Sequence, residues 1–188
     1  MSSIEQGTDR LGTVGRSGDD YEVVFERRLN HPIENVWLAL TEPGAIEKWL
    51  ATASVFEARE GGTVELHWHK GSLDDGMRAT ITEIDPPRLL EWSGGPAGHP
   101  AAACRWELQA DGDGCVLTLT SRVPVDEIDR RAAEEPEMWS PPSMLAGWHL
   151  HLDYLTDVLD RRRTEWEDRP LEEEWRPLFE LYRGMRDD

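Results

Sequence analysis

The hydrophobic pattern changes its period within residues 21–50, which read YEVVFERRLNHPIENVWLALTEPGAIEKWL. Up to Leu29 the residues alternate, which places Phe25, Arg27 and Leu29 on one face of a strand. From Ile33 onward the apolar residues instead recur at the 3.6-residue spacing of a helix. The segment therefore predicts a strand that leads directly into a helix.

Both ends of this helix carry sequence signals. Asn30 or His31 can cap its start, and Pro32 suits its first position. The residues of its apolar face are Ile33, Val36, Trp37 and Leu40. The tripeptide Glu42-Pro43-Gly44 ends the helix, and a second short helix is expected to follow. The apolar residues of that second helix are Ile46, Trp49 and Leu50.

Short alternating segments separated by turn residues predict an antiparallel meander in the middle of the chain. The expected strands are 63–69, 77–84, 88–93, 104–110 and 115–122. Leu11–Val14 is expected to pair with the strand that starts at Tyr21. Cys104 and Cys115 fall on neighbouring strands, which favours two buried free thiols but leaves a disulfide open.

The strongest helical pattern lies between Leu145 and Leu159. Its apolar residues repeat every three or four positions, and they are Leu145, Trp148, Leu152, Leu155 and Leu159. A long apolar stripe of this kind needs a groove in a sheet to receive it.

The length of 188 residues predicts one domain over residues 1–188. Within it, residues 1–10 are expected to be disordered and 123–143 to form a variable loop, short helix or lid. Residues 164–188 are expected to form a helical tail in two short pieces, interrupted at Pro177.

Three parts of the chain resemble one known family. The segment FERRLNHPIENVWLALTEPGAIEKW at 25–49 resembles the opening of the SRPBCC (START-like) superfamily, in the branch named after the heat-shock protein 90 ATPase activator. The segment GWHLHLD at 147–153 resembles the long helix of the same branch, and the Trp- and Tyr-containing tail is similar too. The resemblance implies an α+β helix-grip fold, START-like or Bet v 1-like, with an antiparallel curved sheet wrapped around a long C-terminal helix. It covers only the C-terminal domain of the eukaryotic activators.

The charge balance narrows the class of partner. Asp and Glu total 38 against 20 Lys and Arg, which gives a net charge of −18. Such a chain repels phosphate backbones, so no nucleic-acid partner is expected. No apolar run is long enough to span a bilayer, and MSSIEQGTDR lacks the features of a secretion signal. We therefore expect a cytoplasmic protein without a membrane span.

Motifs for nucleophilic, phosphate-binding or redox chemistry are missing from the sequence: it has no GxSxG, no Gly-rich phosphate loop and no CxxC. His67 and His69 share one face of a strand, but no third or fourth ligand is identifiable, so no metal and no cofactor are expected. His149 and Asp153 lie one helical turn apart. They can act as a base with its orienting carboxylate, although a structural i,i+4 contact is the favoured interpretation.

Four tryptophans are expected to face inward, namely Trp68, Trp92, Trp106 and Trp148. Aromatic walls with few polar groups are typical of a small-molecule pocket, but the same residues also suit plain core packing. Core packing is favoured for Trp148, and the strand tryptophans leave both interpretations open. The predicted ligand-binding residues are Trp68, Trp92, Trp106, Trp148, His149, Leu152 and Arg27.

Three functions are compatible with these features. The first is binding of a hydrophobic small molecule in a cavity between the sheet and the long helix. The second, implied by the resemblance, is a protein-interaction domain that acts on a chaperone ATPase. The third is a cyclase- or dehydratase-type enzyme that uses cavity groups such as His149 and Glu91 to move protons. The tail also allows a homodimer.

Overall fold

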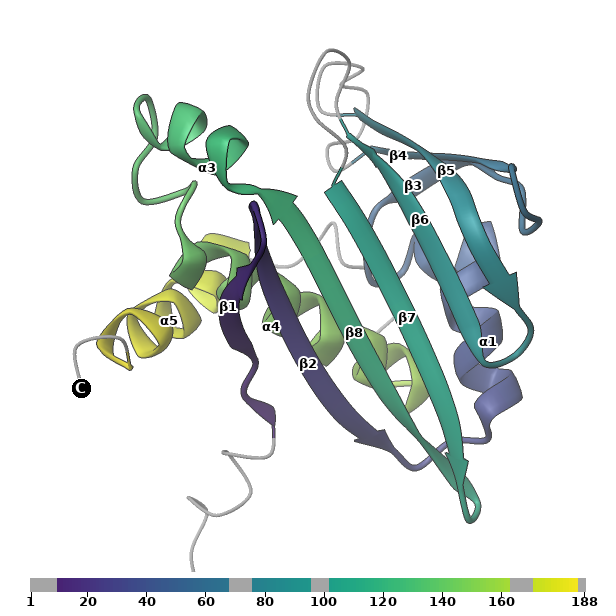
Figure 1. The fold of residues 1–188 in the computed structure, drawn as a ribbon. Helices are drawn as coiled ribbons and strands as arrows, with labels where there is room; N and C mark the ends of the chain where they lie inside the picture. Colours follow the sequence, from purple (N-terminus) through teal and green to yellow (C-terminus); the bar gives the residue numbers. More distant parts are fainter. Residues whose placement is uncertain (1–9, 68–75, 96–101, 163–170, 186–188) are drawn as a thin grey trace, which may run out of the picture.

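The structure is a computed structural model that describes residues 10–67, 76–95, 102–162 and 171–185. Its centre is one eight-stranded antiparallel sheet in the order β1-β2-β8-β7-β6-β5-β4-β3 (Figure 1). The strands are β1 (Thr13–Ser17), β2 (Asp20–Leu29), β3 (Thr52–Phe56), β4 (Thr63–His67), β5 (Gly76–Asp85), β6 (Leu89–Gly95), β7 (Ala102–Asp111) and β8 (Gly114–Pro124). The helices are α1 (Ile33–Thr41), α2 (Pro43–Ile46), α3 (Val125–Ala132), α4 (Pro141–Leu159) and α5 (Leu171–Gly184).

Strand β2 confirms the first part of the predicted strand-to-helix transition. Phe25, Arg27 and Leu29 are all buried, whereas Glu26 and Arg28 between them are exposed. β2 pairs with β8 along its whole length, from Asp20 opposite Pro124 to Leu29 opposite Cys115. The alternation therefore turns one face of the strand toward the core, as the two-residue period requires.

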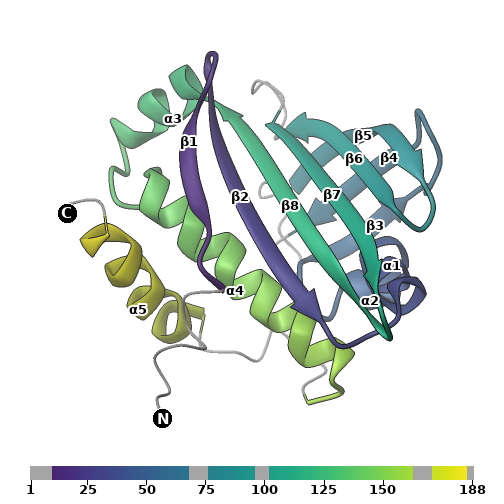
Figure 2. The ribbon, with the colours of Figure 1, turned by 60° about the horizontal axis from the view of Figure 1, so that its bottom comes forward.

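Helix α4 lies across one face of the sheet, and α5 lies beside it (Figure 2). Leu145, Leu152 and Leu155 of its apolar stripe are buried, as predicted. The helix begins earlier than that stripe, because the Ser140 side chain caps it by accepting a hydrogen bond from the Ser143 backbone N–H (3.4 Å). The predicted grip of a sheet on a long helix is thus present.

Strand β3 was not predicted, because its sequence lacks a clean alternation. Among the described strands it lies at the edge of the sheet and pairs with β4 alone, and its register shifts between Ala53 and Val55. A shift of this kind breaks the two-residue period on which the sequence interpretation depends.

Two helix predictions were wrong in detail. Helix α1 starts at Ile33 with Pro32 as its N-cap and no side-chain cap, while His31 Nε2 instead lies 2.7 Å from Asp160 Oδ1. In the described part of the tail, residues 171–185, one helix, α5, continues through Pro177 instead of breaking there. A proline removes one helical hydrogen bond, but burial of Phe179 and Tyr182 beyond it holds the rest of the helix in place.

Cys104 and Cys115 are both free and buried. Cys104 lies opposite Ser121, and Cys115 lies opposite Ala110 at the other end of β7. The six residue steps from position 104 to position 110 span about 20 Å of strand, which is far beyond disulfide reach. The favoured prediction of two free thiols is confirmed.

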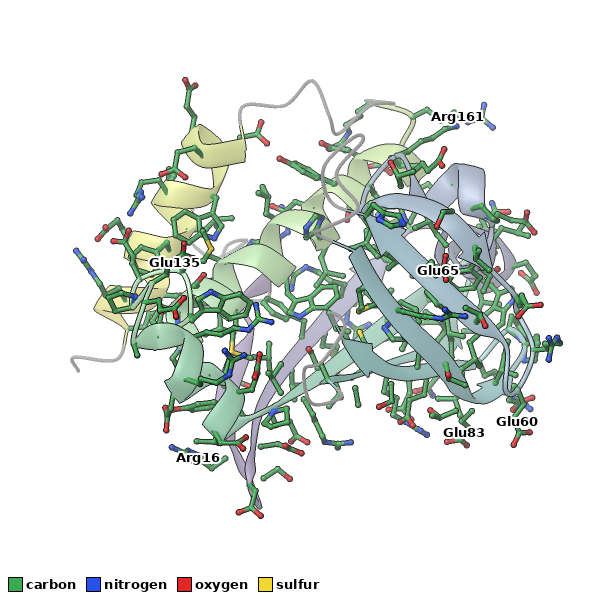
Figure 3. The ribbon with its side chains drawn as sticks, turned by 90° about the horizontal axis from the view of Figure 1, so that it is seen from above. Arg16, Glu60, Glu65, Glu83, Glu135 and Arg161 are labelled. Atoms are coloured by element: carbon green, nitrogen blue, oxygen red, sulfur yellow. The ribbon has the colours of Figure 1, made fainter. Side chains whose placement is uncertain are left out.

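Most of the described charged residues lie around the outside of this core, and Arg27 and Glu127 are buried exceptions. Arg16, Glu83 and Arg161 are labelled at the periphery of the molecule in Figure 3. In the described part of the chain, no helix combines the length and apolar character needed to cross a membrane.

Candidate functional site

A partly open groove of about 1200 Å³ lies between β2, α4 and α5. Its apolar lining comes from Leu29, Leu150, Pro177 and Leu178. Its charged lining comes from Arg10, Glu26, Arg27, Arg28, Asp153, Asp157, Asp160, Arg162 and Glu174. One wall of the groove is therefore sheet, and the other two are helices.

Arg27 is the most unusual group in this lining, because its side chain follows the apolar face of β2 into the core. Only 4% of the residue is exposed. Its Nη1 donates to the Glu26 carbonyl oxygen at 3.2 Å, and its guanidinium lies 5.0 Å from the centre of the Phe25 ring. Its Nε and Nη2 atoms are buried and have no hydrogen-bond partner among the described residues. Burial lowers the pKa of Arg27 to about 10, against the opposing charge of Asp153.

A chain of polar contacts runs from the core to the groove. The Tyr182 hydroxyl accepts a hydrogen bond from the Gly12 backbone N–H at 3.0 Å and lies 2.7 Å from His149 Nδ1. The hydroxyl proton is then free to be donated to Nδ1, which leaves the His149 proton on Nε2. His149 Nε2 lies 3.6 Å from Asp153 Oδ2, a contact longer than a hydrogen bond.

The charge states of this chain follow from its burial. Burial lowers the pKa of His149 to about 4, and the nearby charges of Arg27 and Arg10 act in the same direction. Burial raises the pKa of Asp153, although its Oδ1 accepts a hydrogen bond from Arg10 Nη2 at 2.5 Å. The predicted proximity of His149 and Asp153 is thus confirmed, with a neutral imidazole beside a carboxylate that faces the groove.

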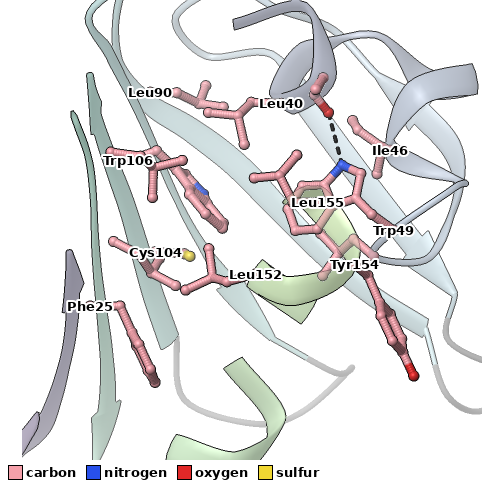
Figure 4. Packing of buried hydrophobic residues seen from close by; sticks show 14 of the residues in the cluster. Phe25, Leu40, Ile46, Trp49, Leu90, Cys104, Trp106, Leu152, Tyr154 and Leu155 are labelled. Carbon is pink, nitrogen blue, oxygen red and sulfur yellow. Dashed lines mark hydrogen bonds between the residues drawn. The ribbon is translucent and has the colours of Figure 1, made fainter. Parts of the chain in front are cut away.

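The described tryptophans of the predicted site pack against one another instead of lining this groove. The Trp106 ring lies 6.0 Å from that of Trp92, 5.6 Å from that of Trp148 and 5.7 Å from that of Trp49. Figure 4 shows Trp49 and Trp106 in the core, with the Trp49 Nε1–H donating to the Ala39 carbonyl oxygen at 2.9 Å. That these rings line a ligand pocket stays a prediction.

The remaining predicted residues are divided between the two regions. Arg27 lines the groove, and His149 reaches it through Asp153. Leu152 is fully buried in the hydrophobic core. Trp68 and His69 lie outside the described residues.

His67 is described, and its Nε2 lies 3.1 Å from the Ser54 hydroxyl. Over residues 10–67, 76–95, 102–162 and 171–185, no group of three or more His, Cys, Asp or Glu side chains is arranged to hold a metal ion.

Sequence reasoning missed Arg10 and Tyr182 as members of the site. Arg10 lies at the end of a segment that was expected to be disordered. Tyr182 was interpreted as part of an apolar tail, yet its hydroxyl contacts His149, which lies 33 residues earlier in the chain. The buried aromatic with a polar tip was the available signal, since such hydroxyls usually find a partner.

An antiparallel sheet that grips a long helix, with a groove between sheet and helices, defines a helix-grip domain of the SRPBCC class. The family described as "Activator of Hsp90 ATPase homolog 1-like protein" matches residues 30–160, and the chain belongs to this family. No curated protein matches the sequence.

Solved structures of the same fold cover most of the chain. CalU16 from Micromonospora echinospora is 21% identical with a TM-score of 0.66, and the match covers 94% of this chain and 98% of that protein. MLL2253 from Mesorhizobium loti is 25% identical with a TM-score of 0.60, covering 74% and 97% of the two chains. EF2215 from Enterococcus faecalis is 14% identical with a TM-score of 0.64, covering 94% and 90%.

Proposed function

We propose that this domain binds a small molecule with an apolar body in the groove between β2, α4 and α5. The observation that supports this most directly is the size and composition of the groove. Its volume of about 1200 Å³ is sufficient for a ligand, since small-molecule sites typically enclose about 300–1000 Å³. Leu29, Leu150 and Leu178 offer apolar contact, and the buried Arg27 among the charged lining residues offers orientation.

This proposal keeps a hydrophobic molecule between the sheet and the long helix, and it places that molecule on the α5 side of the helix. The described tryptophans fill the other side through ring-to-ring contacts. The groove needs no rearrangement of those rings.

Acid–base chemistry is a second candidate function, favoured by one observation. Asp153 lines the groove, burial raises its pKa, and a neutral His149 lies behind it. Carboxyl groups with a raised pKa are typical of catalytic acids and bases, although structural clusters show them as well. A bound molecule that is chemically altered during incubation with the protein would favour this candidate over simple binding.

The test is native mass spectrometry of the protein purified from its own host, followed by denaturing extraction of the bound molecule. Leu178→Trp fills the groove from α5, and Leu181→Trp is the matched control, because Leu181 is exposed on the same helix and does not line the groove. We expect a co-purified small molecule in the native protein and in the control, and its loss in Leu178→Trp.

An empty native protein, or equal occupancy of both variants, would contradict binding in this groove. An empty protein that also ignores a hydrophobic library would shift the function toward a protein partner, in line with the description of the family.

A further inference from the structure

We propose that the ligand of this groove carries a carboxylate, which Arg27 binds side-on through Nε and Nη2. This inference deepens the proposed function and rests on it. It concerns one chemical group of the ligand, and the groove itself accommodates the apolar body.

The geometry of the two unpartnered atoms supports a carboxylate. Nε–H and the outer N–H of Nη2 point in the same direction along one edge of the planar guanidinium, at the spacing of two carboxylate oxygens. The third nitrogen, Nη1, already donates to the Glu26 carbonyl oxygen. The edge of the guanidinium that has no partner, formed by Nε and Nη2, is therefore one that can donate two parallel hydrogen bonds to a carboxylate.

The burial of Arg27 argues that this edge has a function. Buried donors without a partner are rare in folded proteins, and a buried cation is more costly still. Arg27 is 4% exposed, and its guanidinium lies near the Phe25 ring, while none of the acidic side chains in the described part of the chain is within ion-pair distance of it. A bound anion would supply both the missing acceptors and the missing charge.

Three of the five acidic side chains in the lining of the groove have partners other than Arg27. Asp153 accepts from Arg10, Asp160 contacts His31 and Arg162, and Glu174 accepts from the Tyr154 hydroxyl. None of these pairs uses the free edge of Arg27.

The overall balance of the lining is five acidic and four basic side chains. This balance disfavours a doubly charged phosphate and is compatible with a single negative charge, because like charges in a partly buried site repel strongly. A monocarboxylate attached to an apolar body fits both parts of the groove.

The first experiment tests the anion alone by NMR. The Arg27 Nε–H resonance is followed while acetate is added, with chloride at the same ionic strength as the control. We expect a saturable shift with acetate and none with chloride. An Arg27 resonance that acetate leaves unchanged would overturn the proposal, and would indicate that water or protein groups satisfy the edge.

The second experiment compares dodecanoate with dodecan-1-ol by calorimetry, in the native protein, in Arg27→Met and in Arg88→Met. Arg88 is an exposed residue paired with Asp85, so its variant removes the same charge far from the groove. We expect dodecanoate to bind about 10- to 100-fold more tightly than the alcohol, as hydrogen bonds between charged groups suggest. This preference should persist in Arg88→Met and disappear in Arg27→Met.

Equal binding of acid and alcohol, unaffected by Arg27→Met, would refute the carboxylate and leave the small-molecule groove intact. If neither probe binds and acetate has no effect, the carboxylate inference falls. The groove as a binding site is then judged separately, by whether the native protein carries a co-purified molecule.

Discussion

Replacing Arg27 with methionine is expected to stabilise the protein in the absence of ligand. The fall in the pKa of Arg27 from 12.5 to about 10 means that the folded protein disfavours its cation by about 3 kcal/mol. Both folded and unfolded chains keep Arg27 protonated below pH 10, so the whole of this penalty is present at pH 7.

Two favourable contacts oppose the penalty. The variant loses the hydrogen bond to the Glu26 carbonyl oxygen, worth about 1 kcal/mol. It also loses the contact of the guanidinium with the Phe25 ring, worth about 0.5–1 kcal/mol. Methionine fills a similar volume with apolar atoms, so the expected net gain in the free energy of unfolding is about 1–2 kcal/mol.

Urea denaturation at pH 7 measures this gain, and thermal unfolding should show a rise in Tm of about 2–4 °C per kcal/mol for a chain of this size. Arg88→Met is the control and should change stability by less than about 0.5 kcal/mol, because its ion pair with Asp85 is exposed. A loss of more than about 1 kcal/mol in Arg27→Met would refute the reasoning, since it would show that the guanidinium is well satisfied in the free protein.

Three further predictions concern the buried groups. His149→Asn keeps an acceptor for the Tyr182 hydroxyl but does not titrate. In the folded protein the pKa of His149 is lowered from 6.5 to about 4, so on acidification the unfolded chain binds a proton at this residue before the folded chain does. The free energy of unfolding of the native protein should therefore fall by about 3 kcal/mol as the pH drops from 6.5 to 4. In urea denaturation measured over this pH range, the stability of His149→Asn should not show that decrease. Tyr182→Phe should lower the free energy of unfolding by about 1–2 kcal/mol, since the Gly12 N–H and His149 Nδ1 both lose their partner; an unchanged midpoint would contradict this. Cys104 is buried and its pKa is raised well above 9, so it should react with a thiol reagent only as fast as the protein opens; rapid labelling of native protein would exclude the burial.

The parts of the fold that the sequence predicted are those with a regular local period. β2 and α4 each bury one face, and burial of one face imposes alternation on a strand and a three-to-four spacing on a helix. Strand β3 was not predicted, because its register shift interrupts the two-residue period. The prediction wrongly divided α5 at Pro177, because proline usually breaks a helix. The burial of Phe179 and Tyr182, which stabilises the helix beyond Pro177, cannot be inferred from the proline alone.

The candidate site was only partly predictable, for a different reason. Arg27 was recognisable as a charge on an apolar strand face, and the His149–Asp153 contact follows from helix geometry. The Tyr182–His149 contact and the ring contacts of Trp106 join residues that are distant in the sequence. Such contacts depend on how elements pack, and no local pattern encodes them.

Part of the groove is formed by residues that lie outside the segment matched by the family. The family match spans residues 30–160, whereas Arg10, Arg27, Leu178 and Tyr182 all lie outside that range. These residues supply the free guanidinium edge, the partner of Asp153, part of the outer apolar wall and the start of the polar chain. Under the proposed function, the choice of ligand would therefore depend on residues of β2, of the segment before β1 and of α5 as well as on the matched core. Variants within the aromatic cluster should mainly change stability, whereas variants at Arg27 or Leu178 should mainly change binding.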